Sequence, residues 1–170
     1  MTLEFEACEH EDLPLWDFGF VDATRYTLRG EHAPERPAEV LSELVRSPVY
    51  RNNFIEPESF KHDPGPIHGP FRADQIEASD YETLSFEALC DDIRRRLADP
   101  SFSRPPSDEQ RESVGALLAR IKKTALHCFH LKLNRSDDSH RHDWWFVYTI
   151  FHEYIILEHR GLWLLVLGYD

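Results

Sequence analysis

Several histidine and cysteine side chains in the second half of the chain have the chemistry to bind a metal ion. His127, Cys128 and His130 lie in one short segment, His140 and His142 in a polar run, and His152 next to Glu153. Imidazole, thiolate and carboxylate groups are the usual ligands of zinc. A histidine-based metal-binding protein or metal-dependent enzyme is therefore one hypothesis for this chain.

The spacing of these residues argues against a recognised metal motif. On an extended strand His127 and Cys128 point to opposite faces, whereas Cys128 and His130 share one face. The segment that starts at His152-Glu153 begins like the zinc-protease H-E-x-x-H motif but has Ile156 in the last position. The chain also contains no C-x-x-C pair. We therefore expect solvated or hydrogen-bonded histidines, no metal site and no cofactor.

The chain also contains no recognised motif for nucleophilic catalysis or for phosphate binding. The chain lacks a G-x-S-x-G nucleophile elbow and a glycine-rich phosphate loop. Cys90 falls on the apolar stripe of a predicted helix. Cys128 is the only thiol with a neighbour, His127, that could activate it, but adjacent strand residues face apart. Both cysteines are predicted to be packing residues, and enzymatic activity stays an open question that leans towards none.

Glu153 is the carboxylate that breaks a local rule. It interrupts a strongly apolar segment beside His152, and a charge in such a segment needs a partner or access to water. One interpretation places Glu153 on an edge strand or a bulge with its side chain turned to water. The other makes His152-Glu153 a functional site, because such sites often break local patterns.

The elements that must position these residues include a C-terminal sheet over residues 143–170, where aromatic and branched residues dominate. A turn at Arg160-Gly161 predicts a hairpin in which Ile156 opposes Leu165 and Tyr154 opposes Leu167. Residues 144–159 form either one long bent strand or two strands with a bulge near His152. A further strand is predicted over residues 126–133.

Three amphipathic helices are predicted upstream of this sheet. The first begins at Pro37 and runs to about Val45, since proline suits the first helical position. The second is capped by Ser85 and ends before Pro100. The third begins with the S-x-x-Q capping box of Ser107 and Gln110.

The N-terminal third is predicted to contain short strands over residues 3–7 and 16–20, and a stiff surface loop over residues 62–70. The expected fold class is α+β, with a C-terminal antiparallel sheet of three to four strands packed against two amphipathic helices. Short N-terminal strands and a helix complete it. We expect residues 1–170 to form a single domain.

Charge and composition limit the partners. The chain has 170 residues and a formal net charge of −12. Residues 1–60 have a net charge of −8, and residues 121–170 have a net charge of zero. This balance opposes binding to nucleic acid and favours basic partners. No signal peptide and no apolar run long enough for a membrane helix is visible, and the three cysteines are few and widely spaced. These features predict a cytoplasmic protein without membrane contact.

Together these patterns favour a non-enzymatic module that binds a basic protein through an acidic surface. The general profile, which is small, acidic and motif-poor with aromatic C-terminal strands, resembles that of bacterial immunity and inhibitor proteins, although no specific motif is shared. A homo-oligomer in which another subunit completes the C-terminal sheet is a further possibility. The predicted binding residues are Glu9, Glu11, Asp12, Trp16, Asp17, Asp22, His152 and Glu153.

Overall fold

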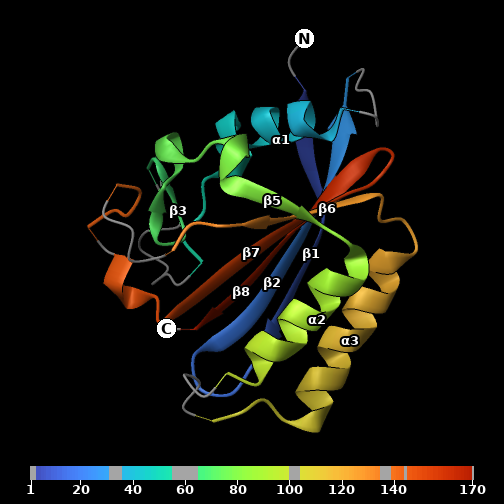
Figure 1. The fold of residues 1–170 in the computed structure, drawn as a ribbon, viewed down its shortest axis with the longest axis vertical. Coiled ribbons are helices and arrows are strands. Elements are labelled where there is room, and N and C mark those ends of the chain that lie inside the picture. The colour runs from blue at the N-terminus through green and yellow to red at the C-terminus, as the bar shows by residue number, and fades with distance from the viewer. Residues whose placement is uncertain are drawn as a thin grey trace.

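An antiparallel sheet of six strands organises the computed structural model, which describes residues 3–30, 36–54, 65–99, 104–134, 139–143 and 145–169. The strands are β1 (Glu4–Pro14), β2 (Gly19–Arg29), β5 (Tyr81–Leu84), β6 (His127–Leu131), β7 (Ile150–Leu157) and β8 (Gly161–Tyr169). Their order across the sheet is β1-β2-β8-β7-β6-β5. The N-terminal hairpin therefore pairs with the C-terminal strand β8 (Figure 1).

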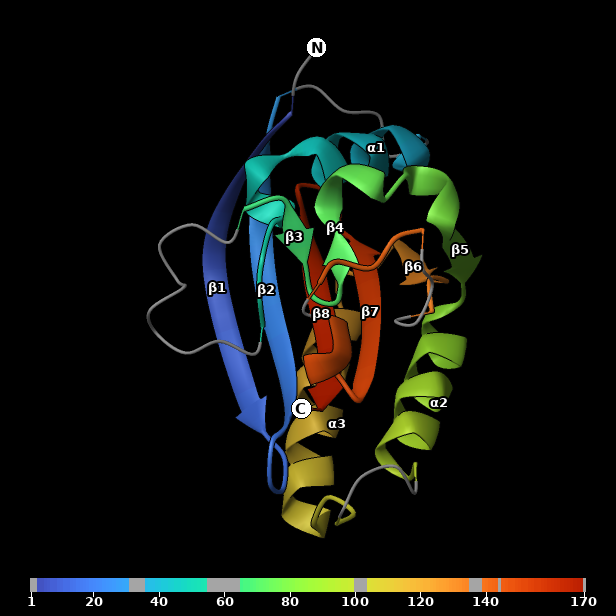
Figure 2. The same cartoon turned by 90° about the vertical axis from the view of Figure 1, so that its left-hand side faces the viewer.

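Helices cover both faces of this sheet. The helices α2 (Phe86–Leu97) and α3 (Asp108–Lys122) pack on one face. The helix α1 (Pro37–Arg46) and the small hairpin of β3 (Ile67–His68) and β4 (Phe71–Arg72) cover the other (Figure 2). Short 3-10 turns complete the described structure: η1 (Pro48–Tyr50), η3 (Ala73–Gln75), η4 (Ala78–Asp80) and η5 (Trp145–Val147). No helix in the described ranges is long and apolar enough to cross a membrane.

The α+β class is confirmed, but the predicted sheet has too few strands. The sheet has six strands rather than three to four, because β1 and β2 join it through the pairing of β2 with β8. A third helix, α1, covers the face that α2 and α3 leave open. The reason lies in β7 and β8, which are buried on both faces and need a layer on each side.

The helix boundaries follow from the predicted caps. Ser85 accepts a hydrogen bond from the Ala88 amide at 3.1 Å, and α2 begins at the next residue. Ser107 and Gln110 form the predicted reciprocal capping box, with hydrogen bonds of 2.9 and 3.1 Å. Pro37 is the first residue of α1. These short-range signals were sufficient to predict where the helices begin, because caps satisfy backbone groups within one turn.

The N-terminal strands differ from the prediction. A strand was predicted from Trp16 to Phe20, but residues 16–18 form the turn between β1 and β2, where Asp17 adopts a positive φ of 59°, and β2 begins only at Gly19. The Leu15 amide donates to the Gly19 carbonyl at 2.8 Å and closes this turn. β1 is longer than predicted and continues past an irregularity between Ala7 and Glu9. The alternation of aromatic residues at 16–20 thus spans a turn and the start of β2 rather than one strand.

The C-terminal strands resolve the alternatives that the sequence left open. β7 is one strand through His152 and Glu153, and its register with β8 has no shift. Residue 144 lies outside the described residues, and the segment after it is the 3-10 turn η5. Tyr154 opposes Leu165, not Leu167 as predicted, because the turn is centred on residues 159–160. This slip of two residues keeps every side chain on its predicted face.

The predicted surface loop over residues 62–70 is wrong for residues 68–70, whereas Pro66 is exposed. Residues 62–64 lie outside the described residues, but His68, Gly69 and Pro70 are buried. The Asn52 amide donates to the Ile67 carbonyl, and the Gly69 amide donates to the Asn52 carbonyl at 2.8 Å. The proline-rich composition indicated an irregular chain correctly but gave no information on its burial.

Candidate functional site

The predicted acidic binding residues lie on one hairpin formed by β1 and β2. Residues 4–29 contain seven carboxylates and two arginines. β1 is the first strand in the sheet order, and among the described strands it pairs only with β2. Its side chains are mostly exposed. The structure thus brings Glu9, Glu11 and Asp12 onto one free sheet edge.

Several of these carboxylates have basic partners within the chain. Arg25 donates to Glu9 at 3.0 Å, and Arg120 of α3 contacts Glu11. Asp22 accepts from His10 at 2.7 Å. Burial raises the pKa of Asp22, with a smaller contribution from the nearby carboxylate of Asp12. Glu4 and Asp12 have no basic partner among the residues that the structure describes.

Two aromatic side chains project from the turn at the end of this hairpin. Phe18 is 69% exposed and Trp16 is 37% exposed. The Arg104 guanidinium lies over the Trp16 ring, 4.1 Å from its centroid, and also approaches Asp17 at 3.7 Å. Trp16 was predicted to be an exposed anchor. Phe18 was not predicted as a site residue, because Trp and Tyr were favoured as interface anchors.

His152 and Glu153 do not form a common site, because they face opposite sides of β7. Glu153 is fully buried in the layer under α1, whereas His152 lies on the face of α2. The interpretation of Glu153 as an edge or bulge residue turned to water is wrong. β7 is a central strand, and the Glu153 carboxylate is hydrogen-bonded inside the protein.

The Glu153 carboxylate is the centre of a buried polar cluster, which we call the Glu153 cluster, formed with His68, Tyr50 and Tyr81. His68 Nε2 and the Tyr81 hydroxyl form short hydrogen bonds with the carboxylate, and the Tyr50 hydroxyl donates to Oε1 at 3.2 Å. The Tyr50 and His68 rings stack with centroids 3.7 Å apart. His68 Nδ1 also contacts the Tyr50 carbonyl.

Both ring nitrogens of His68 face oxygen atoms, Nε2 the Glu153 carboxylate and Nδ1 the Tyr50 carbonyl. Burial and the Glu153 charge raise the pKa values of Tyr50 and Tyr81 well above the usual value for tyrosine. Both phenols therefore stay protonated and act as donors. The cluster ties η1 and β3 to the centre of the sheet, and its members have almost no solvent contact. Its geometry indicates a structural role.

A second buried carboxylate, Glu158, lies at the end of β7 near the turn to β8. It accepts hydrogen bonds from Arg25 Nη2 at 2.8 Å and from Trp163 Nε1 at 3.0 Å, and it contacts the Thr124 hydroxyl. Arg25 also binds Glu9, so this cluster connects β1, β2 and the turn that follows α3. It holds the N-terminal hairpin against the helical layer.

The histidines proposed as metal ligands are spread over the molecule. His140 lies 4.0 Å from Asp80, and His142 Nε2 is 2.7 Å from the Gly69 carbonyl. His130 and His152 come together, with ring centroids 6.1 Å apart. Within the described ranges, no three His, Cys, Asp or Glu side chains are arranged to hold a metal ion.

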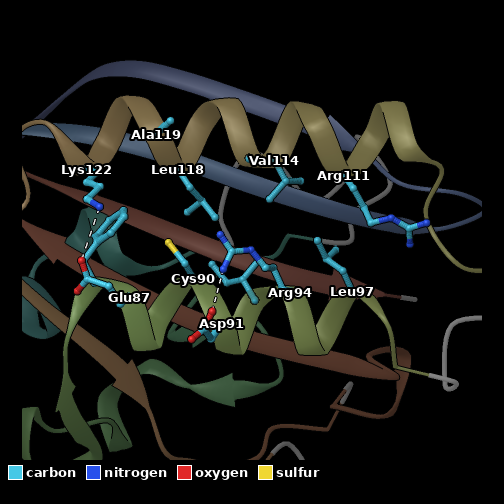
Figure 3. A pocket seen from close by; sticks show the side chains of 13 residues that line it. Glu87, Cys90, Asp91, Arg94, Leu97, Arg111, Val114, Leu118, Ala119 and Lys122 are labelled. Atoms are coloured by element: carbon cyan, nitrogen blue, oxygen red, sulfur yellow. Dashed lines mark hydrogen bonds and ion pairs between the residues drawn. The ribbon is translucent and has the colours of Figure 1, made fainter.

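Cys90 and Cys128 are packing residues, as predicted, whereas Cys8 is exposed. Burial raises the pKa of Cys128 to about 12 and also raises the pKa of Cys90, so both remain thiols at neutral pH. Cys90 lines a groove of about 550 Å³ between α2 and α3 (Figure 3). The groove has an apolar floor, and at its rim Glu87 pairs with Lys122 and Asp91 with Arg94.

The chain matches no protein-family model, and neither curated proteins nor solved structures show significant similarity to it. Any function assigned to the hairpin, the buried clusters or the paired histidines therefore rests on their own chemistry.

Proposed function

We propose that the protein is a non-enzymatic binding module that captures a basic protein partner through the N-terminal hairpin. The observation that carries this proposal is the free edge of β1, which is acidic along its length and ends in two exposed aromatic side chains. An unpaired strand edge offers backbone donors and acceptors to an incoming chain. Exposed aromatic residues supply the contacts that dominate interface energies.

The charge of β1 selects the kind of partner. A second copy of the hairpin would place carboxylates opposite carboxylates, and such pairs are destabilising. The irregularity between Ala7 and Glu9 also discourages regular self-pairing. A basic segment would instead meet Glu4 and Asp12, which have no basic partner among the described residues. An inhibitor-type role, in which the protein occludes the basic surface of its partner, fits this surface.

The arginines that pair with Glu9, Glu11 and Asp17 preorganise the surface for binding. Arg25, Arg120 and Arg104 hold these carboxylates and the Trp16 ring in fixed positions. A surface that is ordered before binding loses less conformational entropy on association. The paired carboxylates thus keep the surface in a fixed shape, while the unpaired carboxylates attract the basic partner.

A charge-reversed hairpin variant tests this proposal. We expect Asp12→Arg combined with Phe18→Ala to weaken binding by about thirtyfold, since loss of one anchor residue costs about 2 kcal/mol. The measurement is a pull-down at several salt concentrations, followed by titration of the recovered partner. The wild-type protein should recover one stoichiometric, basic partner whose binding weakens as salt increases.

The matched control is Asp74→Arg, an equal charge reversal at an exposed position in η3, away from the hairpin. This variant should bind the partner as the wild type does. Equal weakening by both variants would show that only net charge matters and would reject the hairpin as the site. Failure of the wild type to recover any stoichiometric partner at low salt would count against the binding function itself.

A further inference from the structure

A cavity of about 350 Å³ lies where α2 ends against β6 and β7, on the face of the sheet opposite the Glu153 cluster. Its wall contains Arg96, Lys132, Asn134 and Thr149, together with the imidazoles of His130 and His152. The acidic member of the wall is Asp99. Ligand pockets of this size hold small metabolites, and the lining is rich in hydrogen-bond donors.

Two polar atoms of this wall are buried without a hydrogen bond. Arg96 Nε and His130 Nε2 are both shielded from water, and neither has a hydrogen-bond partner among the described residues. The nearest carboxylate oxygen to Arg96 Nε, from Asp92, is 3.6 Å away, beyond a normal hydrogen bond. Unsatisfied buried groups are uncommon and costly, so a pair of them at one cavity indicates missing ligand contacts.

The two atoms require opposite partners. A guanidinium nitrogen can only donate, so Arg96 Nε needs an acceptor oxygen. His130 Nδ1 faces the Glu82 carboxylate at 3.4 Å and carries the proton of the neutral ring, which leaves Nε2 as an acceptor. Burial lowers the pKa of His130 and keeps this ring neutral at pH 7. His130 Nε2 therefore needs a donor.

We propose that this cavity binds a small oxyanion that also carries a hydroxyl group, with an anionic oxygen on Arg96 Nε and the hydroxyl donating to His130 Nε2. Hydrogen phosphate and hydroxycarboxylates share this chemistry. Lys132, which also pairs with Glu82 at 3.1 Å, is a second cationic residue of the wall. The Arg96 side chain keeps 28% of its surface exposed, so it can rotate as a ligand enters.

The same geometry disfavours a metal ion between the two imidazoles. His130 and His152 are close enough to share a ligand, but burial lowers the pKa of both rings, and the Arg96 charge lowers it further. A guanidinium that disfavours a proton on these rings also disfavours a divalent cation. It attracts an anion at the same place.

Two matched pairs of probes test the proposal at pH 7 in a buffer without oxyanions. Phosphate and malate carry the required hydroxyl, whereas sulfate and succinate have similar shapes without it. We expect phosphate or malate to shift the NMR signals of the His130 and His152 rings, and sulfate or succinate to bind at least about tenfold more weakly, because His130 Nε2 would stay unpaired. The pair that shows the preference identifies which of the two anion types the cavity takes.

Substitutions in the cavity wall test whether the anion binds there. Arg96→Gln and His130→Gln should each weaken binding of the preferred probe by at least about tenfold. Arg94→Gln, at an exposed arginine of the same helix, and His127→Gln, at the start of the same strand, should leave it unchanged. Equal binding of the probes with and without a hydroxyl, no response to any of the four, or stoichiometric zinc binding through His130 and His152 would each overturn the proposal.

Discussion

Glu153→Ala is expected to lower the free energy of unfolding by about 3–5 kcal/mol, because it removes the central acceptor of a buried network. His68, Tyr50 and Tyr81 would keep their donors in the protein interior with no carboxylate to receive them. For a chain of this size the loss corresponds to a melting temperature lower by about 6–20 °C. Thermal and urea denaturation followed by circular dichroism measure it.

Glu4→Ala is the matched control, since Glu4 is an exposed carboxylate of β1. Its effect should stay within about 0.5 kcal/mol. Glu153→Gln should fall between the two variants, because the amide oxygen can still accept from one tyrosine while its NH2 group opposes the remaining donors. A stability of Glu153→Ala equal to that of the control would mean that the buried cluster does not hold η1 and β3 on the sheet.

Stability is also expected to fall by about 2–3 kcal/mol between pH 6.5 and pH 4 because of His152. Burial, followed by the charges of Arg96 and His130, lowers the pKa of His152 from 6.5 to about 4. In this window the unfolded chain binds a proton that the folded protein excludes, so the folded state loses stability as pH falls. Above pH 6.5 the contribution is fully present.

Urea denaturation at several pH values, in buffers without oxyanions, tests this effect. Asp92, Asp99, His130 and Arg96 are the charged groups that act on His152, so these residues stay unchanged in the experiment. His152→Gln should flatten the loss of stability between pH 6.5 and pH 4. His159→Gln, at an exposed histidine of the β7–β8 turn, should not. An unchanged pH dependence in His152→Gln would contradict the assignment.

Signals that act within one turn of chain were predictable from the sequence. The caps at Ser85 and Ser107 satisfy neighbouring amides, so they determine where α2 and α3 begin whatever surrounds them. The apolar faces of β7 and β8 were predicted correctly because a slip of two residues preserves the alternation of side chains. The acidity of the N-terminal hairpin likewise needed only the sequence.

The contacts that place Glu153 in a buried cluster and His130 in a cavity wall depend on the tertiary structure. His68 lies 85 residues from Glu153, within a proline-rich segment whose composition is typical of a surface loop. Arg96 belongs to a run of three arginines on α2, and only its position against β6 and β7 separates it from its exposed neighbours.

The sequence by itself therefore determined the helices, the apolar strands and the acidity of the N-terminal segment, because propensity, capping and charge are local properties. Only the tertiary structure decided that Glu153 is buried in a central strand and that the predicted His152-Glu153 pair is divided between two faces. Pairing across a sheet joins residues far apart in the chain, and no local pattern records which strands will be neighbours.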